Sequence, residues 1–191
     1  SHYKQPLDWN EQLIKESIVE RTLMGMKEEG RSFTGTLFIG IMMTSDGPKV
    51  LEYNVRFGDP ETQTILPRLK SNIHPILEAM AYGDVKKFNN SNISFSPLSS
   101  VHIVKAAKGY PGLRGEKIEK DQPISISKNK ELSELYFAGV KKENNQFLTN
   151  GGRVLGMTTL ANTLDNAKKM AYNNIEYCKF LGEQFRGDIG E

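Results

Sequence analysis

The sequence has 191 residues, of which 38% are hydrophobic and 25% charged, with a formal net charge of +2. A chain of this length can bury a core without a metal or a disulfide, and it suits one domain or two small ones. The small net charge excludes a strong general affinity for nucleic acid or for anionic membranes. No apolar run approaches the about 18 residues of a membrane helix, so we expect no membrane partner.

Cys178 is the only cysteine, which excludes an internal disulfide. No signal-peptide pattern is found at the first residues of the sequence. Both observations fit a reducing compartment, and we therefore expect a cytoplasmic protein.

The first half of the chain is predicted to combine helices with one apolar hairpin. An Asp-Gly turn between two β-rich segments is typical of a hairpin. Pro67 is expected to kink or end the helix in which it lies, and Gly83 to close the next helix. In chain order, the predicted elements are a helix over 9–29, a strand over 33–44, a turn over 45–48, a strand over 49–57, and helices over 62–70 and 75–82.

The second half is predicted to contain short strands and a final helix. A polar connection over 84–100, rich in Asn, Ser and Lys, is the predicted boundary between the two halves. Thr163 is expected to cap the final helix and Gly182 to end it, with Cys178 on its apolar stripe as a small core residue. The predicted strands cover 101–107, 124–126, 137–140, 146–149 and 153–160.

The strand over 49–57 is the most informative stretch, because one of its faces is entirely polar. Side chains alternate between the two faces of a strand. The two faces are Leu51, Tyr53 and Val55, which we expect to be buried, and Glu52, Asn54 and Arg56, which we expect to be exposed to solvent.

The polar face carries groups suited to a metal ion and an anion. Glu52 and Asn54 offer hard oxygen ligands of the kind that Mg²⁺ (or Mn²⁺) accepts together with substrate phosphates. Neighbours on one face lie about 6.5–7 Å apart, so both can reach one ion. Arg56 offers planar donors suited to phosphate. The same alternation also fits an ordinary half-solvated strand whose polar face is only wet.

The residues that follow this strand predict a turn and a helix start. Gly58 allows a sharp turn, Asp59 is a good N-cap, and Pro60 suits the first helical position. A glycine turn beside a helix N-terminus is also a site for an anion. Asp59 therefore has two readings, one as a helix cap and one as part of a binding site.

Other polar residues give weaker signals. Gly151-Gly152-Arg153 fits either a strand-entry bulge or a place where a phosphate is held. Lys105 and Lys108 are expected to be solvated, and His102 is expected on the outer face of a strand. His74 and His102 have no cysteine or carboxylate at ligand spacing, so no zinc site is expected.

Several motifs together resemble the phosphoribosylamine–glycine ligase family, whose members have the ATP-grasp fold and act in de novo purine synthesis. The resemblance spans nearly the whole chain, in the order of the family. It is carried by the runs at 33–40 and 51–63, by Gly109-Tyr110-Pro111-Gly112, by Asn150-Gly151-Gly152-Arg153-Val154-Leu155 and by Asp188-Ile189-Gly190.

The resemblance implies an α+β fold with two parts. Residues 1–96 would form the C-terminal part of the ATP-grasp catalytic domain, an antiparallel sheet with helices, and residues 97–191 a small α+β C-terminal domain. The implied reaction joins 5-phosphoribosylamine to glycine at the expense of ATP, through a glycyl phosphate. In that reading Glu52 and Asn54 hold Mg²⁺, Arg56 holds the transferred phosphate, and Asp59 either orients the glycine amine or caps its helix.

The sequence departs from the family pattern in two ways. Phe137 and Val140 stand where the family usually has His and Thr, so any polar contribution from those residues is absent. The N-terminal domain and the lid that clamps ATP are also missing, so we expect an incomplete and inactive enzyme. Two alternatives stay open at this point, a non-catalytic interaction fragment and another ATP-grasp carboxylate–amine ligase or carboxylase.

Overall fold

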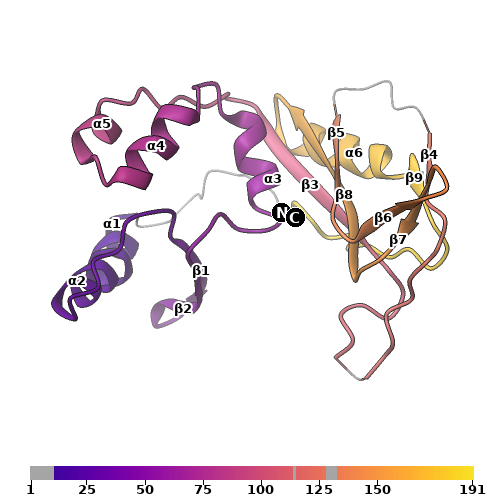
Figure 1. Ribbon diagram of the computed structural model, residues 1–191, viewed down its shortest axis with the longest axis horizontal. Helices are drawn as coiled ribbons and strands as arrows, with labels where there is room; N and C mark the ends of the chain where they lie inside the picture. The colour runs from indigo at the N-terminus through magenta and orange to yellow at the C-terminus, as the bar shows by residue number, and fades with distance from the viewer. Residues whose placement is uncertain (1–10, 114, 128–132) are drawn as a thin grey trace. The chain divides into compact units, whose positions relative to one another are not determined.

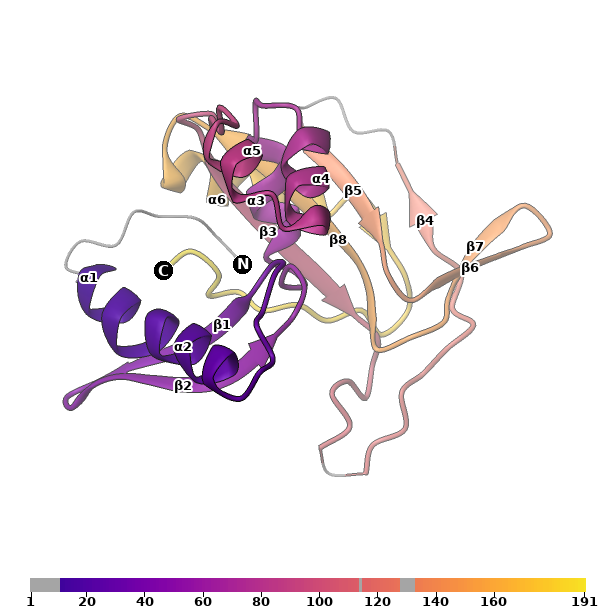
Figure 2. The ribbon, with the colours of Figure 1, turned by 60° about the vertical axis from the view of Figure 1, so that its left-hand side comes forward.

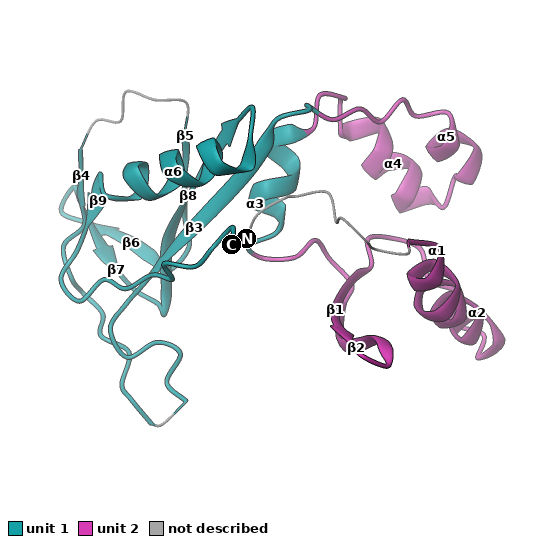
Figure 3. Ribbon diagram, turned by 180° about the vertical axis from the view of Figure 1, so that it is seen from behind, with its two compact units in different colours: residues 1–4, 60–68, 96–191 teal, residues 5–59, 69–95 magenta. Residues whose placement is uncertain are grey.

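The computed structural model describes residues 11–113, 115–127 and 133–191. The described chain forms two compact units, which Figure 3 shows in different colours. Unit 2 contains the described residues up to Asp59 and Leu69–Phe95, and unit 1 contains Pro60–Arg68 and Ser96–Glu191. Residues 60–68 thus belong to unit 1, although the sequence places them before the predicted boundary.

A continuous helix opens the described part of unit 2. It consists of α1 (Glu11–Ile14), the π-helical η1 (Lys15–Glu20) and α2 (Arg21–Glu28). These elements match the helix predicted over 9–29, of which residues 9 and 10 lie outside the described part. The helix runs along the neighbouring hairpin (Figure 2), and the hydroxyl groups of Thr22 and Tyr53 form a hydrogen bond of 2.9 Å between them.

The hairpin consists of β1 (Phe38–Thr44) and β2 (Gly47–Asn54), which pair antiparallel. The chain reverses at Ser45 and Asp46, and Gly47 has a φ of 93°, which favours glycine. The register shifts because Gly40 pairs with Glu52 whereas Ile41 pairs with Val50. Leu51 is therefore the extra residue of a β-bulge.

Two helices complete unit 2. α4 (His74–Tyr82) begins with Pro75 near its N-terminus and ends at Gly83, whose φ of 64° forms a left-handed cap, as predicted. α5 (Val85–Asn89) lies in the segment predicted to be an irregular connection. The side chain of Asp84 accepts a hydrogen bond from the Lys87 amide and caps this helix, a signal that the sequence interpretation missed.

Unit 1 is built on a three-stranded antiparallel sheet with one helix packed against it (Figure 1). The strand order is β3 (Ser99–Ala106), β8 (Arg153–Ala161), β5 (Ser133–Phe137), and α6 (Leu164–Ile175) lies on one face. Thr163 caps α6 by accepting from the Asn166 amide, as predicted. The core between sheet and helix includes Val101, Ile103, Val154, Leu155, Met157, Ala167, Ala171 and Ile175.

Short elements surround this sheet. They are α3 (Thr62–Ile65) with the 3₁₀ turn η2 (Leu66–Arg68), the hairpin of β6 (Val140–Glu143) and β7 (Gln146–Thr149), and the pair of β4 (Ser125–Ile126) and β9 (Cys178–Lys179). The break between α3 and η2 lies next to Pro67, as predicted. Helices and antiparallel sheets together confirm the predicted α+β class.

The structure corrects four predictions in unit 1. The last helix ends at Ile175 instead of Gly182. Cys178 is buried as predicted, but in β9, where its carbonyl accepts from Lys105 Nζ instead of from a helix amide. His102 and Lys105, expected to face solvent, are 2% and 0% exposed. Both side chains are buried because each has polar partners inside the unit.

Candidate functional site

Glu52 and Asn54 lie two residues apart at the end of β2, so their side chains share one face of the hairpin. Glu52 is exposed and Asn54 is half-buried. Gly40, the partner of Glu52 across the hairpin, leaves room for the glutamate. A Cβ at position 40 would come within 3.0 Å of Glu52 Cγ. The hairpin therefore offers one carboxylate and one amide on the same face.

Arg56 lies beyond the end of this strand. β2 ends at Asn54, so the prediction that the strand continues to residue 57 is wrong. The exposed guanidinium donates from Nη1 to the Phe57 carbonyl at 2.9 Å, a contact within its own bend. Arg56 is thus carried by a loop that begins where the strand stops.

The opposite face of the hairpin is not buried. Leu51, Tyr53 and Val55 are 64%, 47% and 73% exposed, so the predicted core face is wrong. A two-stranded hairpin with one helix beside it has too little neighbouring surface to cover an apolar face. The bulge at Leu51 and the strand end at Asn54 also interrupt the alternation on which the prediction rested.

Asp59 does not occupy the helix cap. α3 begins at Thr62, its N-cap position is Glu61, and the Glu61 side chain makes no capping bond. The first turn is closed instead by the Thr64 and Ile65 amides, which both donate to the Glu61 carbonyl at 3.0 Å. Asp59 itself is exposed. The prediction that Asp59 caps this helix is therefore wrong.

The donor set on the hairpin fits a metal that is shared with phosphates. Within the described ranges, no group of three or more His, Cys, Asp or Glu side chains is placed to hold a metal ion. Mg²⁺ is usually bound by one or two protein groups plus substrate phosphates, so a carboxylate and an amide suffice only when a phosphate ligand is present. Glu52 and Asn54 fit that role and do not fit a metal site made of protein alone.

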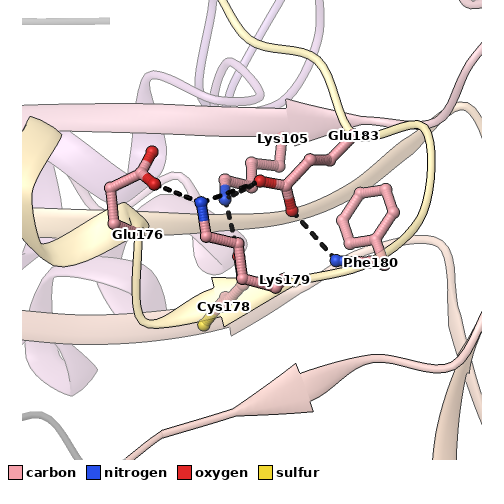
Figure 4. A network of polar contacts seen from close by, with 6 residues as sticks. All are labelled: Lys105, Glu176, Cys178, Lys179, Phe180 and Glu183. Carbon is pink, nitrogen blue, oxygen red and sulfur yellow. Dashed lines mark hydrogen bonds and ion pairs between the residues drawn. The ribbon is translucent and has the colours of Figure 1, made fainter.

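The sequence interpretation missed a buried polar network in unit 1, shown in Figure 4. Lys105 Nζ donates to the Cys178 carbonyl at 2.6 Å and forms an ion pair with Glu183 at 2.7 Å. The other carboxylate oxygen of Glu183 accepts from the Phe180 amide at 2.9 Å. Lys179 joins Glu176 to Glu183 at the edge of the network. These bonds fasten the chain after α6 to β3.

Hydrogen bonding and burial shift the pKa values of Glu176, Lys179 and Cys178. The hydrogen bond from Lys179 lowers the pKa of Glu176, and the same bond raises the pKa of Lys179. Burial raises the pKa of the Cys178 thiol, which keeps it in its less reactive protonated form. Cys178 is therefore a structural core residue.

The glycines before Arg153 have a packing role. A Cβ at Gly152 would come within 2.3 Å of the Tyr110 ring, and a Cβ at Gly151 within 3.0 Å of the Gly139 backbone. The pairing of β3 with β8 shifts register at Val154, next to these glycines. These contacts favour the strand-entry bulge among the two readings of this motif.

The family-specific segment around Phe137 is apolar in this chain. The Phe137 ring packs on Phe147 with centroids 4.8 Å apart, and Val140 packs against the core of unit 1. The structure thus gives both substituted positions a packing role.

Comparison with known proteins assigns both parts of the chain. The profile for the ATP-grasp (A) domain of phosphoribosylglycinamide synthetase matches residues 4–62, and the profile for the C domain of the same enzyme matches residues 100–191. The chain belongs to the phosphoribosylglycinamide synthetase family. Its resemblance to phosphoribosylamine–glycine ligases is therefore confirmed.

Curated relatives of this family are similar over almost the whole chain. The phosphoribosylamine–glycine ligase of Halalkalibacterium halodurans is 41% identical over 94% of the chain, and that of Caldanaerobacter subterraneus is 38% identical over 92%. The trifunctional purine biosynthetic protein adenosine-3 of Gallus gallus is 40% identical over 93%. The chain spans 40% of the length of each of these two bacterial ligases and 17% of the Gallus gallus protein.

Solved structures agree with this assignment. The phosphoribosylamine–glycine ligase of Thermotoga maritima superposes with a TM-score of 0.73 at 31% identity, over 96% of this chain and 44% of that one. The biotin carboxylase domain of a Hydrogenobacter thermophilus 2-oxoglutarate carboxylase superposes with a TM-score of 0.60 at 14% identity, a likeness of fold alone. The predicted ATP-grasp relationship is thus confirmed. None of the described helices is long and apolar enough to span a membrane.

Proposed function

We propose that this chain is the C-terminal portion of a cytoplasmic ATP-dependent ligase that joins 5-phosphoribosylamine to glycine. The observation that carries the proposal is the collinear match of both family profiles, supported by 38–41% identity to two bacterial ligases. In this proposal, residues 1–96 contribute to the ATP-grasp catalytic domain and residues 97–191 form the C-terminal domain. The N-terminal and lid domains come from the part of the relatives that this chain does not match.

The proposed reaction has two steps. Transfer of the ATP γ-phosphoryl group to the glycine carboxylate gives glycyl phosphate and ADP. The amine of 5-phosphoribosylamine then attacks the acyl carbon, and inorganic phosphate leaves as glycinamide ribonucleotide forms. Both steps place negative charge on phosphoryl oxygens beside the polar face of the hairpin, where fixed donors are most effective.

Residues of the hairpin and its loop take distinct roles in this proposal. Glu52 and Asn54 would hold Mg²⁺, or Mn²⁺, together with ATP phosphates, and the metal would supply neutralisation of phosphate charge when bound. Arg56 would exchange its contact with the Phe57 carbonyl for two donors to the transferred phosphate. Asp59, which is exposed, would accept a hydrogen bond from the glycine amine.

The test uses a chimera in which this chain replaces the matching segment of the Halalkalibacterium halodurans ligase. Glu52→Gln keeps the shape and one oxygen but removes the charge, so turnover should fall at least about 100-fold, with partial recovery at high Mg²⁺. Arg56→Lys should also lower turnover, because a point charge cannot replace the bidentate fork. Phosphate release with ATP, glycine and 5-phosphoribosylamine measures both effects.

Asp46→Asn is the matched control, because it removes a carboxylate from the turn of the same hairpin without touching the proposed site. Normal turnover in Glu52→Gln and Arg56→Lys would contradict the proposed roles. The alternative of a non-catalytic interaction fragment would rest on the exposed side chains of Leu51 and Val55. That alternative predicts a chimera with no ligase activity at all.

A further inference from the structure

The segment at 60–68 contains Pro67, which interrupts its α-helical hydrogen bonding. In an α-helix, the carbonyl of Gln63 would accept from the amide of residue 67. Residue 67 is proline, which has no N–H to donate. Thr158 supplies the missing donor, because its Oγ1 donates to the Gln63 carbonyl at 2.8 Å. Ser100 Oγ likewise donates to the Thr64 carbonyl at 2.7 Å.

The C-terminal end of the segment is also hydrogen-bonded to the rest of unit 1. The Arg68 side chain is buried, and it donates from Nε to the Leu98 carbonyl at 2.7 Å and from Nη2 to the Ser96 carbonyl at 2.9 Å. The Ser96 amide returns a hydrogen bond of 2.6 Å to the Arg68 carbonyl. Side chains and backbone of β3, β8 and the chain before β3 thus hold a short segment whose own helical bonds are incomplete.

His102 fixes the direction of the Thr158 hydroxyl. A threonine hydroxyl has one proton, and here that proton goes to Gln63. The contact of 2.8 Å between His102 Nδ1 and Thr158 Oγ1 therefore has the histidine as donor, which selects the Nδ1–H tautomer. The ring occupies the space above Gly156, where a Cβ would come within 2.2 Å of Nε2, and it meets the Tyr136 ring edge-on at 5.9 Å.

We propose that His102 and Thr158 form a positioning pair that fixes segment 60–68 and so sets the end of the loop that carries Arg56 and Asp59. Asp59 is bonded directly to Pro60, the first residue of that segment. A change in the segment is therefore passed along the backbone to Asp59 without any side-chain contact. The effect on catalysis rests on the proposed ligase function. The fixing of segment 60–68 by His102 and Thr158 does not.

The chain offers a matched pair of variants for the test. Thr158 and Thr159 are adjacent on β8 and both fully buried, but within the described structure Thr159 Oγ1 has no hydrogen-bond partner. Thr158→Val removes two hydrogen bonds at almost constant shape, Thr159→Val removes none, and Thr158→Ser restores the hydroxyl. Amide exchange of Thr64 and Ile65, both bonded to the Glu61 carbonyl, reports whether the segment is held.

We expect exchange at Thr64 and Ile65 to accelerate about tenfold in Thr158→Val, and to stay at the wild-type rate in Thr159→Val and Thr158→Ser. Nitrogen NMR of the His102 ring should show the Nδ1–H tautomer in the wild type and a loss of that preference in Thr158→Val. Unchanged exchange in Thr158→Val, equal acceleration in Thr159→Val, or an Nε2–H tautomer in the wild type would each overturn the positioning pair.

These measurements use the 191-residue chain and require no ligase activity, so they separate this inference from the proposed function. In the chimera, Thr158→Val should lower kcat about tenfold with little change in KM for ATP, and Thr159→Val should leave both unchanged. Normal kcat in Thr158→Val alongside accelerated exchange would overturn the catalytic part of the pair. A chimera without any ligase activity would instead refute the proposed function and leave the amide-exchange result in place.

Discussion

Lys105 shows how far one residue can depart from its expected surroundings. Its position next to a glycine turn suggested a solvated lysine, yet the side chain has no exposed surface. Sequence alone could not reveal this, because the carboxylate that compensates its charge, Glu183, lies 78 residues further along the chain. The Phe185 ring, with its centroid 5.5 Å from Nζ, adds a cation–π contact.

Replacing Lys105 with methionine should destabilise unit 1 by about 3–5 kcal/mol, because the variant leaves the Glu183 charge buried without its main partner. Urea unfolding followed by circular dichroism measures the change. The double variant Lys105→Met with Glu183→Gln should recover part of the loss. Lys108→Met is the control, since its pair with Glu119 is exposed to solvent and should contribute little to stability. Equal losses in both lysine variants would show that the buried network is not special.

At the scale of the elements, the sequence predicted those helix caps, helix breaks and turns that depend only on neighbouring residues. The left-handed cap at Gly83, the break next to Pro67 and the cap at Thr163 all follow from residues within one turn of the feature. The hairpin was also predictable, because its turn and its β-rich strands are local. Capping of α5 by Asp84 has the same origin and was missed only because the segment looked like a connection.

Features that depend on distant residues could not be predicted. The burial of His102 requires the space above Gly156 and a hydroxyl from β8. The early end of α6 depends on pairing of Cys178 with Ile126. The polar face at Glu52 and Asn54 was predictable from alternation, whereas the bulge at Leu51 depends on the register of both strands. Local patterns thus predicted the shared face of Glu52 and Asn54, but they did not predict that the apolar residues opposite are exposed.

The cap of α6 gives a prediction at this scale. Thr163→Ala removes the oxygen that accepts from the Asn166 amide and should cost about 1 kcal/mol of folding free energy. The loss should appear in urea unfolding of unit 1, because α6 covers the core face of the three-stranded sheet. Thr163→Ser keeps the oxygen and should be close to the wild type. A loss as large in the serine variant would assign the effect to the threonine methyl group instead.

At the scale of the whole molecule, unit 2 leaves much of its apolar surface exposed. Leu51 on β2 and Val55 just after it are more exposed than the polar Asn54 between them. The relatives contain more than twice the length that this chain matches, since the chain covers 40% of the two bacterial ligases. In the proposed function, the exposed face and the pair of oxygen ligands Glu52 and Asn54 have one explanation, a site that further parts of the ligase would complete.

The last prediction follows from that condition. The 191-residue chain alone should show no ligase activity and should bind ATP weakly or not at all. In the proposed function, Glu52 and Asn54 would hold Mg²⁺ only with phosphates present, and the groups that bring in those phosphates would belong to parts of the relatives that this chain does not match. Water also remains in an open site, so the effective dielectric constant ε is higher there than in a closed site. The Coulomb energy of two charges, about 332/(ε·r) kcal/mol, is then several-fold weaker.

Titration calorimetry with ATP and Mg²⁺ tests this prediction on the chain and on the Halalkalibacterium halodurans chimera. We expect a measurable heat of binding for the chimera, reduced by Glu52→Gln, and none for the chain at the same concentrations. Circular dichroism of the chain must show folded protein, so that missing heat reflects an incomplete site and not an unfolded one. Micromolar ATP binding by the chain alone, lost in Glu52→Gln, would mean that the nucleotide site is complete within these residues and that the other parts of the ligase serve catalysis only.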